Sequence, residues 1–189
     1  MRWTGVTIRA CAAAVLIAGT GLFASMASAA TLIDFSGDKN ADPYVQEGFS
    51  FDPARIVNGN CVSKGCLALN DNESTSMTYI GTPSLFTLSG LSFNLLGNGT
   101  GNSLTLTGSN GTSLTYAVAD FAKNTYHSLV FGDAFADVSS VLFSTGGGGN
   151  VRIDDLNATP APVPLPAAAW LLLAGIGSFA AVRRRSAAA

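Results

Sequence analysis

Between residues 31 and 166, short apolar runs alternate with polar residues, and no ten-residue stretch keeps the 3.6-residue period of a helix. A period of two puts successive side chains on opposite faces of a strand. The clearest example is segment 104–116, where leucines alternate with threonines on both sides of a turn ending in Asn110-Gly111. Such a turn tolerates positive φ and is typical of a β-hairpin.

The same pattern predicts further strands along the chain, and residues 31–157 are enough for one domain with one core. Many short strands at this spacing predict an all-β fold, a single antiparallel β-sandwich of jelly-roll type. The predicted strands lie near 31–35, 44–51, 67–70, 74–80, 85–96, 103–107, 113–119, 127–131, 138–144 and 150–156.

Residues 1–30 have the pattern of a secretory signal peptide. Arg2 and Arg9 supply the positive start, residues 10–23 are apolar, and small residues surround the predicted cleavage point after Ala29 or Ala30. We therefore expect signal peptidase to remove this segment.

The C-terminal end has three parts: a Pro/Ala-rich linker (158–166), an uncharged apolar run (167–182) and an arginine-rich tail (183–189). As a helix, the apolar run would be about 24 Å long, slightly short of a bilayer core. It is predicted to be a transmembrane helix with Arg183, Arg184 and Arg185 in the cytoplasm, which leaves the domain outside. A permanent single-pass anchor would show the same pattern, whereas a buried core helix gives no reason for three arginines.

Val163, Pro164, Leu165, Pro166 and Ala167 precede that helix. Together with the helix and the arginines, they resemble the PEP-CTERM type of bacterial sorting signal in its Val-Pro-Leu-Pro-Ala variant. The resemblance implies a Gram-negative host that makes extracellular polysaccharide, and recognition of this motif by exosortase. It also implies that Arg183–Arg185 retain the precursor in the inner membrane, before release to the cell surface or the extracellular matrix.

Without the predicted signal peptide and the C-terminal apolar and arginine-rich segments, residues 31–166 are acidic. Five basic residues remain against all 12 acidic ones, a net charge of −7. Such a surface does not neutralise phosphates, so nucleic acid is not an expected partner. It is better suited to binding cations.

One acidic stretch places an oxygen-bearing side chain at every second position from Asp34 through Asp38 to residue 42. Asp154 and Asp155 end the last predicted strand, and the first and last strands of such sandwiches often lie side by side. Because calcium takes six to eight oxygen ligands, Asp34, Asp38, Asp154 and Asp155 form a candidate calcium site. A solvated acidic loop explains the same pattern.

Cys61 and Cys66 are the cysteines of the segment between the two ends, and in an exported protein they are predicted to form a disulfide. Catalysis has little support, so we do not expect an enzyme. The single histidine, His127, lies in a strand-like run, and neither Glu47 nor Glu73 belongs to a recognisable acid pair.

Three classes of function remain open. A structural or adhesive component of the biofilm or exopolysaccharide matrix is the first prediction, and a carbohydrate-binding module is the alternative. An enzyme ranks third. Sugar binding usually uses exposed aromatic side chains as stacking surfaces, and the domain offers four tyrosines and no tryptophan.

Overall fold

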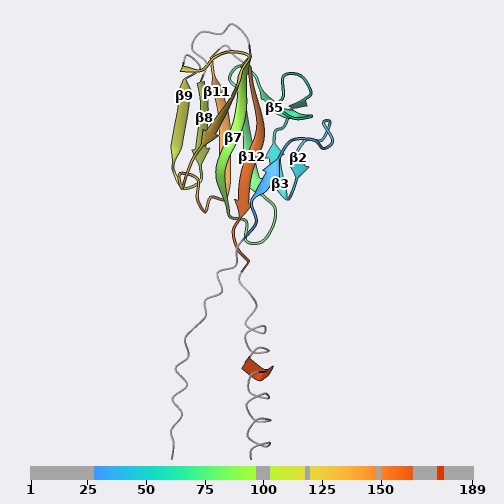
Figure 1. The fold of residues 1–189 in the computed structure, drawn as a ribbon, viewed down its shortest axis with the longest axis vertical. Coiled ribbons are helices and arrows are strands. Elements are labelled where there is room, and N and C mark those ends of the chain that lie inside the picture. The colour runs from blue at the N-terminus through green and yellow to red at the C-terminus, as the bar shows by residue number, and fades with distance from the viewer. Residues whose placement is uncertain (1–27, 97–102, 118–119, 148–149, 164–173, 177–189) are drawn as a thin grey trace, which may run out of the picture.

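The chain forms two antiparallel sheets of six strands each, packed face to face (Figure 1). The computed structural model describes residues 28–96, 103–117, 120–147, 150–163 and 174–176. Sheet A has the order β10-β7-β12-β5-β4, with β1 also paired to β12, and sheet B has the order β2-β3-β6-β11-β8-β9. The strands are β1 (Thr31–Ile33), β2 (Tyr44–Gln46), β3 (Phe49–Asp52), β4 (Ile56–Val57), β5 (Cys66–Leu69), β6 (Ser74–Tyr79), β7 (Phe86–Leu96), β8 (Ser103–Gly108), β9 (Ser113–Ala117), β10 (Tyr126–Val130), β11 (Ser140–Gly146) and β12 (Asn150–Pro160).

The predicted β-sandwich is therefore confirmed, with differences in detail. The segment predicted as one strand, 44–51, is a hairpin, because Glu47 and Gly48 both take positive φ (52° and 80°) and reverse the chain. The two-residue strand β4 was too short to be predicted. The last strand continues to Pro160, past the predicted domain boundary at residue 157, because residues 158–160 pair with β7.

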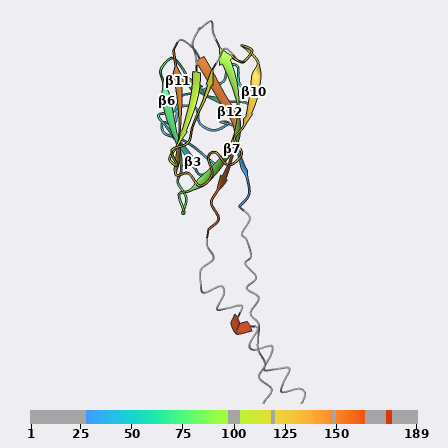
Figure 2. The ribbon, with the colours of Figure 1, turned by 90° about the vertical axis from the view of Figure 1, so that its left-hand side faces the viewer.

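Figure 2 shows the two sheets as separate layers. The core lies between them, and alternate residues of the long strands contribute to it. Its largest side chains are aromatic, and several form edge-on ring contacts, such as Phe49 with Phe86 at 5.3 Å between ring centres. The buried core cluster begins at Ile33 and ends at Ala158. One continuous core within this range is what an independently folding domain requires.

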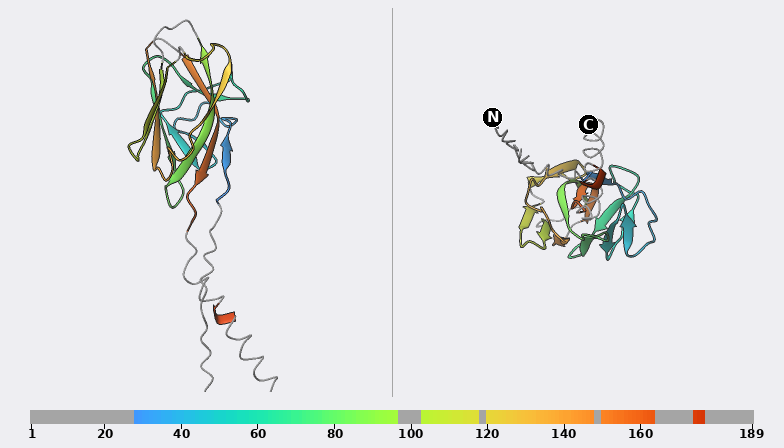
Figure 3. Two further views of the ribbon diagram at one scale, coloured as in Figure 1. Left: turned by 60° about the vertical axis from the view of Figure 1, so that its left-hand side comes forward. Right: turned by 90° about the horizontal axis from the view of Figure 1, so that it is seen from below.

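The first and last strands lie side by side, as expected. In the β1–β12 pairing, Thr31 faces Ala158 and Ile33 faces Leu156. The described chain therefore enters and leaves the sandwich at the same end (Figure 3).

The pairing of β12 with β7 is interrupted twice. Its register shifts between Asp154 and Asn157, and again between Asn157 and Ala158. Ile153 and Leu156 are both fully buried, so the strand gains an extra residue between them. This bulge turns Asp155 to a φ of 47°, and it lies on β12, the middle strand in the order of sheet A.

The predicted signal peptide, the motif from Pro164 onward and most of the predicted transmembrane segment lie outside the described residues. Among the residues that are described, no helix is long and apolar enough to cross a membrane.

Candidate binding site on the outer face of sheet A

A groove with a volume of about 570 Å³ crosses the outer face of sheet A at the β12 bulge. Its floor is made of small residues of β7 and β10, including Ser89, Gly90, Ser92 and Ser128. Its walls carry the apolar side chains of Leu32 and Val130, which are 52% and 85% exposed, and the polar side chains of Asp155 and Asn157. The groove therefore combines hydroxyl, amide and carboxylate groups with two exposed aliphatic side chains.

Small residues on the two adjacent strands β7 and β10 open this groove. Ser128 faces Ser92, and Val130 faces Gly90, so no large side chain rises from the middle of the face. The Ser92 and Ser128 hydroxyl oxygens lie 3.4 Å apart. The backbone of β10 passes so close to position 90 that only glycine fits there. A Cβ atom at this position would lie 2.6 Å from the carbonyl oxygen of Leu129.

Asp154 lies under the surface beside the groove and is fully buried. Its carboxylate accepts hydrogen bonds from the Ser63 backbone N–H (2.9 Å), the Ser63 hydroxyl (3.0 Å) and the Asp155 backbone N–H (2.9 Å). Burial raises the pKa of Asp154, and these hydrogen bonds oppose the rise. Asp154 therefore ties the bulge of β12 to the loop that contains Ser63.

That loop is closed by the predicted disulfide, which is confirmed. Cys61 and Cys66 are bonded, with a Cα–Cα distance of 5.4 Å. Inside the loop, the Ser63 hydroxyl also lies 2.8 Å from the carbonyl oxygen of Asp34, just after β1. The disulfide loop thus joins the ends of β1 and β5 to the bulge of β12.

The structure brings three of the four candidate calcium ligands into one region. Asp155 lies close enough to Asp154 and Asp34 for their charges to raise its pKa, although burial is the larger cause. The Asp34 carboxylate accepts a hydrogen bond from Gln46 Nε2 (2.6 Å), which lowers the pKa of Asp34. Asp38 instead accepts a bond from the Asn40 backbone N–H in its own exposed turn.

No group of three or more His, Cys, Asp or Glu side chains within the described ranges is arranged to hold a metal ion. Asp34 Oδ1 and both carboxylate oxygens of Asp154 already accept hydrogen bonds from the protein, so calcium would have to compete with these donors. The calcium site stays a prediction.

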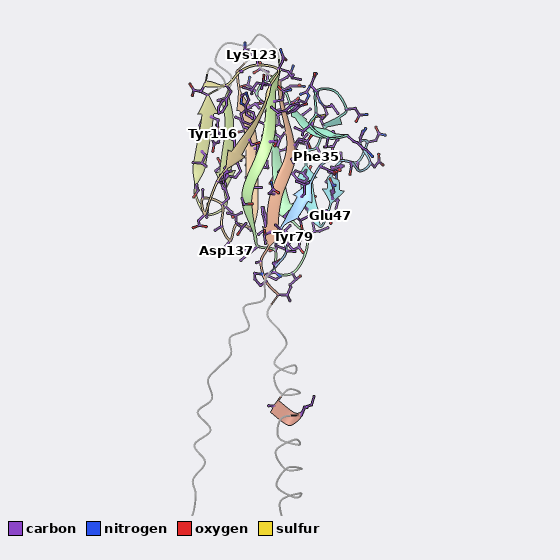
Figure 4. The ribbon with its side chains drawn as sticks, in the orientation of Figure 1. Phe35, Glu47, Tyr79, Tyr116, Lys123 and Asp137 are labelled. Carbon is purple, nitrogen blue, oxygen red and sulfur yellow. A yellow bond between two sulfur atoms is a disulfide. The ribbon has the colours of Figure 1, made fainter. Side chains whose placement is uncertain are left out.

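One aromatic side chain lies on the same outer face as the groove. Tyr126 is 40% exposed and stands two residues before Ser128 on β10, about 7 Å along the strand. Tyr44 is buried, and Tyr79 and Tyr116 pack against the core; Figure 4 shows Tyr116 on β9. The sequence alone could not select Tyr126, because its neighbours alternate less clearly than those of the β8–β9 hairpin.

Next to Tyr126 in the sheet lie Asn94 and Arg152, which face each other across β7 and β12. Asn94 is 3% exposed. Among the described residues, its Oδ1 atom and the Nε atom of Arg152 are buried without a hydrogen-bond partner. Buried polar atoms normally have a hydrogen-bond partner, and these two are exceptions.

His127 points to the other side of β10, into the sandwich. Its ring packs against Phe93 and Phe121, with ring centres 5.4 and 5.0 Å away, and its Nε2 lies 2.8 Å from the carbonyl oxygen of Ala122. His127 is therefore a packed side chain of a strand, as its strand-like sequence context indicated.

No protein-family model matches this sequence, and no curated protein does. Solved structures of similar fold include the CBM22-1 xylan-binding domain of Xyn10C from Paenibacillus barcinonensis, with 11% identity and a TM-score of 0.40 over 74% of this chain and 100% of that one. A point variant of the family 29 carbohydrate-binding module CBM29-2 has 14% identity and a TM-score of 0.42, over 70% of this chain and 93% of that one. A CBM61 module in complex with β-1,4-galactotriose has 11% identity and a TM-score of 0.34, over 60% and 89% of the two chains. At these identities the similarity concerns the β-sandwich fold and carries no argument about a shared ligand.

Proposed function

We propose that the domain binds an extracellular polysaccharide in the groove on the outer face of sheet A. The observation that carries the proposal is the composition of the groove. Ser89, Ser92, Ser128 and Asn157 offer neutral donors and acceptors that match sugar hydroxyls, and Leu32 and Val130 offer apolar contact to the faces of the rings. Its volume of about 570 Å³ is in the usual range for ligand sites.

Tyr126 extends this surface along β10. Its ring is large, rigid and partly exposed, which suits stacking against a sugar ring, and its hydroxyl can bond to the same ligand. Tyr126 lies two residues, or about 7 Å, from Ser128 along β10, and Ser128 lines the groove. The ligand of this proposal is therefore a chain of several sugars rather than a single ring.

A glycan array probed with residues 28–163 tests this function. We expect saturable binding that falls about tenfold, or 1.4 kcal/mol, in Tyr126→Ala, and a smaller loss in Asn157→Ala. Thr107→Ala on the opposite face of the sandwich is the matched control and should bind as the unchanged domain does. If the domain binds no glycan saturably, or if Tyr126→Ala and Asn157→Ala bind as well as the control, the groove is not a glycan site.

We also propose that the N-terminal and C-terminal segments of the chain direct the domain to the cell surface. Signal peptidase would remove the first segment and exosortase the second. The support is the arrangement of β1 and β12, since both ends of the domain face the same way and can meet the same membrane. Replacing Pro164 and Pro166 with alanine should block removal of the tail, and replacing Arg183–Arg185 with serine should weaken retention. Mass spectrometry of the exported protein decides: a mature chain that still ends at Ala189 contradicts this proposal.

A further inference from the structure

The edges of the two sheets differ in how well they are protected. An edge strand offers unpaired N–H and C=O groups to another strand, and proteins protect such edges by keeping them short or by adding charges and prolines. β1, β2 and β4 have only two or three residues each, and Pro43 directly precedes β2. The edge strands β9 and β10 have five residues each and contain neither a charged side chain nor a proline.

Three residues of β10 have backbone N–H and C=O groups that point toward the open edge of the sheet. Phe131 N–H donates to the Ser89 carbonyl at 2.9 Å, one position beyond the Val130–Gly90 pair. Because the direction of backbone hydrogen bonds alternates along an antiparallel strand, His127 and Leu129 also bond toward β7. The N–H and C=O groups of Tyr126, Ser128 and Val130 therefore point away from the sheet, where β10 is the last strand (Figure 2).

We propose that β10 pairs antiparallel with β10 of a second copy of this chain, around a two-fold axis at Ser128. The side chains are self-complementary about that residue. Tyr126 of each copy comes opposite Val130 of the other, an aromatic and β-branched pair of the kind that stabilises sheets. Ser128 faces Ser128 of the second copy, and each of these pairs exchanges both of its N–H···O=C bonds.

The exposed side chains favour β10 over β9 as the pairing edge. Val130 is 85% exposed and Tyr126 is 40% exposed, and both would lose apolar surface to water in the pair. The outward side chains of β9 are Ser113, Thr115 and Ala117, and two of them already bond within their own sheet. A two-fold pair of β9 would therefore bury little apolar surface on that face.

The pairing would join two copies of sheet A into one continuous sheet. Ser128, Leu129 and Val130 line the groove, so the two grooves and both Tyr126 rings would lie on one face. Two linked sites bind one long ligand more tightly than either site alone. The pairing itself depends only on β10 and not on the identity of the groove's ligand.

Light scattering after size-exclusion chromatography, over micromolar to millimolar concentrations of residues 28–163, tests the pairing. We expect a mass that rises with concentration from one copy to two, because a contact of one short strand is smaller than a stable interface. Ser128→Lys and Ser128→Glu each place two like charges opposite one another and should stay monomeric. An equimolar mixture of the two variants should dimerise again, since the introduced lysine of one copy would then face the introduced glutamate of the other. Thr115→Lys, the equivalent change at the centre of β9, should dimerise as the unchanged domain does.

Thermal melting of each variant checks that the fold is retained. The proposal is overturned if the unchanged domain stays monomeric throughout, or if Ser128→Lys dimerises normally. It is also overturned if Thr115→Lys alone prevents dimerisation, which would assign the contact to β9. Failure of the mixed variants to dimerise would overturn the two-fold register at Ser128. None of these readouts involves a glycan, so they are independent of the array experiment.

Discussion

The two outer faces of the sandwich are built from the same kind of strand but differ in regularity. On sheet B, hydroxyl side chains lie in straight rows across paired strands, such as Thr105 beside Thr115 and Thr107 beside Ser113, with oxygens 3.0 and 3.2 Å apart. No register shift interrupts β6, β11, β8 or β9. On sheet A, two register shifts, a disulfide loop and a buried aspartate disturb the alternation.

The regular strands and the candidate groove lie on different faces: sheet B is regular, and the groove lies on sheet A. Along β6, β11, β8 and β9 the unbroken period of two gives an outer face without charged side chains, on which hydroxyl groups bond to their neighbours across the strands. The extra residue in β12 changes the direction of Asp154 and Asp155, and this opens a groove and creates a buried polar contact with Ser63. The comparison predicts that substitutions change the stability of the domain more at the irregular face than at the regular one.

The largest effect is expected for Asp154→Ala. This change leaves the partly buried Ser63 and Asp155 backbone N–H groups without their acceptor, and an unsatisfied group of this kind costs up to about 1–3 kcal/mol. We expect a loss of about 3 kcal/mol in the free energy of unfolding, measured by urea denaturation of residues 28–163. Asp154→Asn, which keeps one acceptor oxygen, should lose less.

Thr107→Ala is the control on the regular face. Its hydroxyl bonds only to the exposed Ser113 hydroxyl, so the free energy of unfolding should change by less than about 0.5 kcal/mol. Equal losses in Asp154→Ala and Thr107→Ala would show that the two faces do not differ in this way.

A smaller effect is expected from opening the disulfide. Replacing both Cys61 and Cys66 with alanine releases a short loop, for which the chain-entropy estimate is about 2 kcal/mol. The loop also presents Ser63 to Asp154, so the losses from the double cysteine variant and from Asp154→Ala should not add. Denaturation of the three variants measures this coupling; full additivity would mean that the loop and the bulge act independently.

The regular parts of the molecule could be predicted from the sequence. The Leu/Thr alternation of segment 104–116 defined the β8–β9 hairpin, and two cysteines in an exported chain identified the disulfide. The groove could not be predicted, because it depends on the register between β7 and β12, which are far apart in sequence. Nothing local marks Ser63 as the partner of Asp154, 91 positions away. The sequence offered Asp34 and Asp154 as calcium ligands, and the structure shows Asp34 Oδ1 and both carboxylate oxygens of Asp154 accepting hydrogen bonds from the protein.

The smallest effect is expected for Asp155→Asn, and it depends on pH. Burial first, and then the charges of Asp154 and Asp34, raise the pKa of Asp155 in the folded domain. The folded state therefore holds this proton more tightly than the unfolded chain, whose carboxyl has a pKa of about 3.9. The ionised side chain destabilises the domain at pH values above its folded pKa, and this cost disappears as the pH falls toward 4.

Asparagine has no charge and tolerates the positive φ of this position. Asp155→Asn should therefore melt slightly higher than the unchanged domain at pH 7, with a difference that narrows toward pH 4. Asp137→Asn makes the same chemical change at another positive φ (51°) on the exposed surface and is the matched control. Melting curves of the three proteins between pH 4 and pH 7 measure the effect. A difference in melting temperature for Asp155→Asn that stays constant over this range, or that widens toward pH 4, would mean that burial and the neighbouring carboxylates do not raise the pKa of Asp155.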